Sequence, residues 1–168
     1  MSQRTRIVIG VIILLLLVGG VLAVDALQRS AASTSSAAGD PSLPPGSIPI
    51  YLDGLLAGTF VSEQLEQLEI ASFVDAEEGK TQEGPRLADV LLLYVPAGQL
   101  NPDTVIVVRS SGRGKAAELT WAEVEDPDNE VQFDLSGRGT LKLVSVLERM
   151  DVRDEWIQDV DRIDVINP

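Results

Sequence analysis

The chain has 168 residues, contains neither cysteine nor histidine, and carries a formal charge of -13. The missing cysteine excludes disulfides, thiolate nucleophiles and cysteine-ligated metals, and the missing histidine removes the usual catalytic triads and the commonest general base at neutral pH. Because the acidic residues repel phosphate backbones, nucleic acid is not an expected partner.

The N-terminal residues have the composition of a membrane segment. Arg4 and Arg6 precede an unbroken apolar run over 7–24, which is about long enough to cross a hydrocarbon core of about 30 Å. The positive end favours an orientation with the N-terminus in the cytoplasm. Residues 1–26 are therefore predicted to be a transmembrane anchor or a signal peptide.

The choice between these two alternatives depends on cleavage. Gly19 and Gly20 can end the helix before Val21-Leu22-Ala23, whose small residues resemble a signal-peptidase site. The length of the run favours the anchor, because the apolar part of a signal peptide usually has about 7 to 15 residues. Either way the following domain is expected outside the cytoplasm, membrane-anchored in one case and secreted in the other.

A flexible linker is predicted over 27–46, where Ser, Ala, Gly and Pro predominate and large apolar residues are rare. Pro44 and Pro45 stiffen its end and mark the start of the folded part. The remaining residues, 47–168, have the length of one ordinary domain, so a single core is expected.

The domain is predicted to begin with a strand over 47–52, because apolar residues alternate there and the tight-turn pair Asp53-Gly54 follows. Ser62 is a suitable N-cap for a short helix through Leu68. A second strand is expected over 69–74.

The polar segment 75–83 is predicted to be a surface loop. Gly84-Pro85 follows it and places proline in the first turn of a helix over 86–94. Apolar residues at helical spacing form the face of this helix that is expected to meet the core: Leu87, Val90, Leu91 and Tyr94.

Two hairpins are predicted in the second half of the domain. The β-branched run 104–108 leads through the glycine-rich turn 111–114 to a partner strand over 116–119, and residues 131–135 and 140–146 repeat the arrangement. Between them, Thr120 and Glu123 form a capping box that opens a short helix ended by Pro127. Trp156 and the apolar residues after it lead into a closing strand over 163–166, so the predicted class is α+β, with a mostly antiparallel sheet and short helices.

One four-residue sequence occurs twice, as Ser111-Gly112-Arg113-Gly114 and as Ser136-Gly137-Arg138-Gly139. If both turns lie at one end of the sheet, their arginines and backbone N–H groups can bind a phosphate or carboxylate. The alternative is two ordinary hairpin turns, each with a solvated arginine. The candidate anion-binding residues are Arg109, Ser111, Gly112, Arg113, Ser136, Gly137 and Arg138.

Other polar clusters and the aromatic residues have structural interpretations. Asp126, Asp128 and Glu130 alternate as calcium ligands do, but Pro127 interrupts them, which favours a helix stop. The carboxylates near the C-terminus are interleaved with arginines and favour a salt-bridged surface. Both tryptophans stand beside apolar neighbours and are expected in the core.

Several segments, taken in order, match the pattern of one known family. They are the "G-x-x-L-x-D-x-L" helix entry at Gly84 to Leu91, the strand and glycine turn at Val107 to Gly112, "L-T-x-x-E" at Leu119 to Glu123, "G-x-L-R-L-V" at Gly139 to Val144 with Lys142 in place of the Arg, and "W-x-x-x-V-x-x-I-x-V" at Trp156 to Val165. Together they resemble the oxidoreductase molybdopterin-binding domain, which has the sulfite-oxidase-like fold. The resemblance covers about Ile48 to Ile166.

This resemblance implies a scaffold that has lost its chemistry. In that family a cysteine thiolate ligates molybdenum, and this chain has no cysteine. Of the residues that bind the cofactor in that family, the resemblance leaves only Arg109 or Arg113 as a contact for an anion. The separated arginines of Arg4-Thr5-Arg6 also differ from the twin-arginine signal of exported enzymes that carry a cofactor. No cofactor is therefore expected, and molybdopterin enters only through the resemblance.

Three functions stay open at this point. The first is a non-catalytic binding or accessory module, tethered to the membrane, that contacts a protein partner or a small anionic ligand. The second is a molybdopterin-dependent oxidoreductase or redox subunit with a metal ligand other than cysteine. The third is a structural spacer within a membrane complex. Fold resemblance alone does not choose among them.

Overall fold

The computed structural model describes residues 43–134 and 140–168. Contacts divide the chain into Met1–Ser42 and a compact unit, Leu43–Pro168. The predicted membrane segment 1–26, most of the predicted linker 27–46 and the second SGRG turn at 136–139 lie outside the described residues. Within the described ranges, every helix is too short or too polar to cross a membrane.

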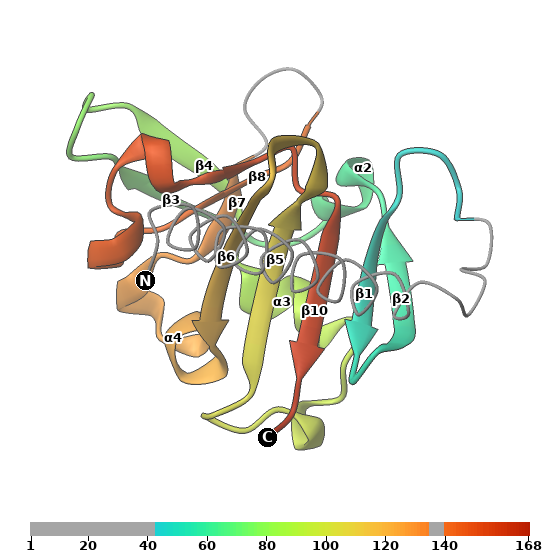
Figure 1. Cartoon of the computed structure of the whole chain (residues 1–168). Coiled ribbons are helices and arrows are strands. Elements are labelled where there is room, and N and C mark those ends of the chain that lie inside the picture. The colour runs from blue at the N-terminus through green and yellow to red at the C-terminus, as the bar shows by residue number, and fades with distance from the viewer. Residues whose placement is uncertain (1–42, 135–139) are drawn as a thin grey trace, which may run out of the picture. The chain divides into compact units, whose positions relative to one another are not determined.

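The largest sheet has five strands that stand side by side in Figure 1. Neighbouring strands are antiparallel except β1 and β10, which are parallel. The predicted mostly antiparallel pairing is therefore confirmed. In sheet order the strands are β2 (Leu55–Phe60), β1 (Ile48–Leu52), β10 (Arg162–Ile166), β5 (Val105–Ser110) and β6 (Lys115–Thr120).

Two smaller sheets adjoin each other. One is the hairpin of β3 (Ile70–Val74) and β4 (Thr81–Pro85), and the other contains β7 (Gln132–Asp134), β8 (Lys142–Val144) and β9 (Ile157–Gln158). A backbone bridge between Arg86 and Gln132 connects them. Gly84 lies directly against the backbone of Phe133. Strand β3 is therefore the outer strand of this second layer.

Within residues 43–134 and 140–168 the α-helices are short: α2 (Ser62–Leu65), α3 (Leu87–Leu92) and α4 (Trp121–Glu125). The buried face of α3 consists of Leu87, Val90 and Leu91, three of the four residues that its helical spacing predicted. The fourth, Tyr94, lies beyond the end of the helix at Leu92 and is only partly buried. These side chains join one core with the inner residues of the five-stranded sheet and with Phe133 and Leu143. The α+β class is confirmed for the described residues.

Local turn and cap signals predicted several elements correctly. Asp53 and Gly54 both have positive φ, at 50° and 81°, as a tight two-residue hairpin turn requires. Helix α4 begins with the predicted capping box of Thr120 and Glu123. Trp156 and Trp121 are buried in the folded unit, with 1% and 7% of their surface exposed.

The predicted N-cap at Ser62 is wrong. Ser62 is the first residue of α2, and Val61 occupies the cap position. The Gln64 side chain accepts a hydrogen bond from the Val61 N–H at 3.0 Å. A side chain within the helix therefore satisfies the backbone N–H of the cap residue. The helix ends at Leu65, three residues earlier than the predicted end at Leu68.

The predicted loop over 75–83 is correct for 75–80, but residues 81–83 belong to strand β4, and the predicted helix start at Gly84-Pro85 is wrong. Both residues belong to strand β4, which returns antiparallel to β3, and the helix begins at Leu87. The Asp75 carboxylate organises the connection by accepting hydrogen bonds from the N–H groups of Glu78 and Lys80. The polar composition of β4 concealed it, because its burial depends on packing against β7 rather than on local alternation.

Candidate functional site

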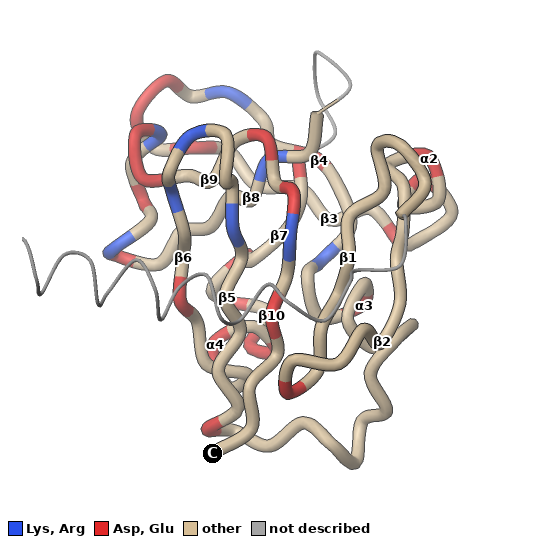
Figure 2. The backbone as a smooth tube through the Cα atoms, turned by 45° about the vertical axis from the view of Figure 1, so that its right-hand side comes forward, with Lys and Arg blue, Asp and Glu red and all other residues tan. Residues whose placement is uncertain are grey.

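The first SGRG turn joins β5 to β6. Ser111, Gly112 and Arg113 form one turn of 3-10 helix, and Gly114 closes it with a φ of 62°. Arg109 lies two residues earlier, near the end of β5. Figure 2 shows basic and acidic segments alternating at this end of β5, β6 and β10. We call this region the arginine end of the sheet, defined by Arg109, Ser111 to Arg113, and Asp159 to Asp164.

Two arginines on neighbouring strands share one carboxylate at the arginine end. Arg109 and Arg162 are directly opposite each other in the pairing of β5 with β10. Arg109 Nε donates to Asp164 at 2.8 Å, and Arg162 donates to both oxygens of the same side chain at 2.7 to 3.1 Å. The Arg162 guanidinium also lies 4.1 Å from the ring centre of Tyr51.

These contacts keep Asp164 ionised. Burial alone would raise the pKa of this carboxyl group, but the hydrogen bonds from Arg162 and Arg109 outweigh that effect and lower the pKa below its ordinary value. The two guanidinium groups therefore bind an anion at this end of the sheet, and the anion is supplied by the chain itself.

The turn binds two further carboxylates. The N–H and hydroxyl groups of Ser111 donate to the two oxygens of Asp161, at 2.7 and 3.1 Å. Arg113 Nε donates to Asp159 at 2.5 Å. Asp159 and Asp161 lie in the connection between β9 and β10, about fifty residues after the turn. The donors that the sequence singled out do bind carboxylates, and these come from the same chain.

Some donor capacity at the arginine end is unused. No described residue accepts a hydrogen bond from the two terminal nitrogens of Arg109, whose side chain is 45% exposed. Arg113 is 43% exposed, and its contact with Asp159 uses only Nε. A guanidinium group has five N–H donors, so both side chains can bind a second anion without losing the first. Ser136, Gly137 and Arg138, the other half of the predicted site, lie outside the described residues.

The molybdopterin chemistry of the resembling family does not fit the residues of this chain. That chemistry needs a thiolate ligand, and the sequence has no cysteine. Among the residues that the structure describes, no group of three or more carboxylates is arranged to hold a metal ion. Asp126 instead caps a 3-10 turn at Pro127–Asn129 by accepting from the Asp128 N–H. We therefore derive no redox step.

Comparison with known proteins adds no family to this picture. No protein-family model and no curated protein matches the chain. The resemblance to molybdopterin-binding domains thus stays a prediction from sequence.

A buried ion pair in the second layer was not predicted. Lys142 of β8 contacts Asp134 of β7, directly opposite in register, at 2.5 Å, and the Asp134 side chain has no exposed surface. Lys142 also donates to Gln82 at 3.0 Å and lies 4.8 Å from the ring centre of Trp156. Because the ammonium group is bonded on several sides, this cluster ties β4, β7 and β8 together rather than offering a free base.

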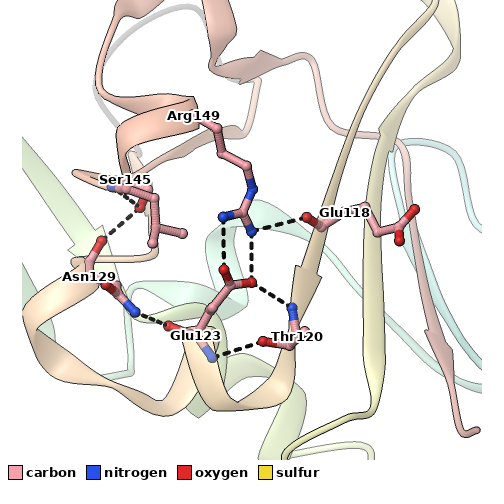
Figure 3. A network of polar contacts seen from close by, with 7 residues as sticks. Glu118, Thr120, Glu123, Asn129, Ser145 and Arg149 are labelled. Carbon is pink, nitrogen blue, oxygen red and sulfur yellow. Dashed lines mark hydrogen bonds and ion pairs between the residues drawn. The ribbon is translucent and has the colours of Figure 1, made fainter.

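A second polar network, shown in Figure 3, holds α4 to the segment after β8. Arg149 donates to both oxygens of Glu123 at 2.7 Å and also to the backbone oxygen of Glu118. Glu123 in turn accepts from the Thr120 N–H at 2.8 Å. The capping box was predicted from its spacing, but Arg149 was not, because it is 26 residues away in sequence.

This network predicts a specific loss of stability in acid. The hydrogen bond from Arg149 is the main reason why the pKa of Glu123 is lowered from 4.5 to about 2. A lowered carboxyl pKa contributes stability that is complete above pH 4.5 and is lost as the pH falls toward 2. Replacing Glu123 by Gln should remove about 1 to 2 kcal/mol of unfolding free energy at pH 7, after allowance for solvent screening. Urea unfolding between pH 7 and pH 2 measures this.

The matched control is Glu118→Gln, which removes a nearby charge whose carboxylate does not bind Arg149. We expect its stability to differ from the wild type by less than about 0.5 kcal/mol. If the two variants lost the same stability at pH 7 and kept the same acid dependence, the bond between Arg149 and Glu123 would not be the cause.

Proposed function

We propose that residues 47–168 form a non-catalytic binding module, held outside the cytoplasm by residues 1–26, that binds a small anion or an anionic group of a partner at its arginine end. The observation that carries this proposal is the unused donor capacity of Arg109 and Arg113 beside a turn that already binds carboxylates. The sulfite-oxidase-like scaffold belongs to the same proposal and is supported by the sequence resemblance alone.

The chemistry of the donors favours an oxyanion. Guanidinium groups match the geometry of carboxylate and phosphate, and backbone N–H groups in a tight turn add fixed dipoles. The chain as a whole carries a charge of -13, so a free anion approaches most of its surface against repulsion. The arginines at the arginine end therefore make this region the favoured place on the surface for an anion to bind.

The anion site predicts a stabilising effect of phosphate that depends on two arginines. An anion that binds only the folded state raises the unfolding free energy, by about 1 to 2 kcal/mol at concentrations some tenfold to thirtyfold above Kd. We expect the melting temperature of the full-length chain to rise by about 4 °C or more in phosphate or sulfate. Replacing Arg113 and Arg138 together by Ala should abolish that rise. Thermal unfolding in matched ionic strength measures both.

Two further variants make this experiment specific. Lys80→Ala removes an exposed cation of the β3–β4 connection, where it pairs with Glu78, and should leave the phosphate effect intact. Asp159→Asn removes the carboxylate that competes for Arg113 and should strengthen the effect. Asn also tolerates the positive φ of 57° at that position. A wild type whose melting temperature is the same in phosphate and in chloride contradicts the proposal.

A further inference from the structure

Strand β3 has an unusual composition for the outer strand of a sheet. Its five residues, Ile-Ala-Ser-Phe-Val, include no charge and no proline. It pairs with β4 on one side, and no other strand of the described ranges pairs with its second side. Edge strands are normally protected by charges, prolines or bulges, because an open edge can pair with another chain. The uncharged composition of β3 therefore leaves its open edge able to pair with a strand of another chain.

The hydrogen-bond pattern shows which backbone groups point to that open side. The Asp75 N–H donates to the Lys80 oxygen at 2.9 Å, which makes this the hydrogen-bonded type of antiparallel pair. Such pairs alternate along a ladder, so the next bonded pairs toward the N-terminus of β3 involve Phe73 and Ala71. The N–H and C=O groups of Ile70, Ser72 and Val74 therefore point away from β4. The pairing of Ile70 supports this orientation, because the residue opposite it, Pro85, has no N–H to donate to Ile70.

The same three residues expose their side chains. Ile70 is 48% exposed and Val74 is 62% exposed, with Ser72 exposed between them, whereas Ala71 and Phe73 are half-buried. One face of β3 thus presents apolar side chains at alternate positions, and its open edge presents the backbone donors and acceptors of those same residues. This is the arrangement that strand addition requires, in which backbone bonds give affinity and alternate side chains give specificity.

The surroundings of this edge are acidic. Glu69 precedes the strand, Glu83 lies opposite Ser72 on β4, and both are exposed. A depression of about 420 Å³ at the start of β3 is lined by Glu69, Ile70, Ala71, Arg86 and Asp89. Its lining includes two acidic residues and one arginine, so a basic side chain is favoured there over an acidic one.

We propose that the open edge of β3 binds an extended segment of a partner protein, with apolar side chains at alternate positions and Lys or Arg at the end that lies beside the start of β3. The apolar residues would pack beside Ile70 and Val74, and the basic end would meet Glu69 and Asp89. A second copy of this chain fits less well. Antiparallel pairing of two β3 strands centred on Ser72 would place the Glu69 end of one beside the acidic Asp75 end of the other.

The test uses the full-length chain in neutral detergent and a fluorescent synthetic peptide in which Val and Thr alternate between terminal lysines. We expect saturable binding, measured by fluorescence anisotropy, that weakens as the NaCl concentration rises. Ser72→Pro should weaken the binding by about tenfold or more, because it removes an outward N–H without removing a bond to β4. Ser72→Ala keeps that N–H and should bind as the wild type does.

A peptide that is N-methylated at the positions facing β3 makes the test independent of protein folding, and it should bind about tenfold more weakly than the unmethylated peptide. Equal binding of the two peptides, or equal binding by Ser72→Pro, would overturn the proposal, as would a wild type that binds neither peptide. Sedimentation velocity decides the remaining alternative. A wild-type dimer that Ser72→Pro converts to monomer would show that a second copy covers the edge, and would also overturn it.

Discussion

Replacing Gly84 by Ala should destabilise the domain by about 3 kcal/mol or more. A Cβ atom at this position would lie 1.7 Å from the backbone oxygen of Phe133 and 2.8 Å from its carbonyl carbon. Both obstacles are backbone atoms of the neighbouring strand β7, so no side-chain rotation can relieve the contact. Strands β4 and β7 would have to separate, which would disturb the core around Phe133. Urea unfolding of the wild type and the variant measures the difference.

Gly98→Ala is the matched control for this prediction. Gly98 lies in a short 3-10 turn, its φ is not positive, and nothing lies within 4 Å of the position of an added Cβ. Its stability should stay within about 0.5 kcal/mol of the wild type. If Gly84→Ala proved as stable as Gly98→Ala, the close approach of β4 to β7 would be refuted.

Replacing Lys142 by Met should cost about 3 kcal/mol, because it removes the cation that contacts the fully buried Asp134 carboxylate. Met keeps the length of the side chain, so the loss reflects charge and hydrogen bonding more than volume. The substitution also removes the hydrogen bond to Gln82 and the contact of the ammonium group with the Trp156 ring. Thermal and urea unfolding at pH 7 measure the effect.

The double variant Lys142→Met with Asp134→Asn separates the pair from the packing around it. Removing both charges eliminates the buried carboxylate that lost its contact with Lys142, so the double variant should recover about half of the loss or more. Losses that simply add in the double variant would indicate that the two side chains do not act as a pair.

Much of the fold was predictable because the deciding signals are local. The Asp53-Gly54 turn, the capping box of Thr120 and Glu123, and the glycine turn at 111–114 each depend on a few adjacent residues. Strand β4 was missed because the burial of its polar residue Gln82 depends on β7, fifty residues later in the chain. Proline after glycine at a helix start is a common pattern, yet here tertiary packing places Gly84 inside a sheet.

The sequence indicated the hydrogen-bond donors of the candidate site, but not the carboxylates that accept from them. The sequence singled out Arg109, Ser111 and Arg113 as donors for an anion, but it did not predict that carboxylates of the same chain accept hydrogen bonds from them. One signal was present, since Asp164 lies in the predicted strand over 163–166 and Arg162 comes two residues earlier, where it shares the face of Asp164 if the strand begins one residue sooner, as β10 does. The pairing of β10 with β5, which brings that face to Arg109, depends on the whole sheet.

Phosphate titration of the isotope-labelled full-length chain, followed through backbone amide chemical shifts, tests the proposed binding module most directly. The account predicts that the amides of Ser111 to Gly114 and of Asp159 to Arg162 shift first and saturate together, because the ligand meets the turn and the carboxylates that compete for it. Amide shifts that are absent, or that spread over the rest of the domain while these two segments stay unchanged, would contradict it.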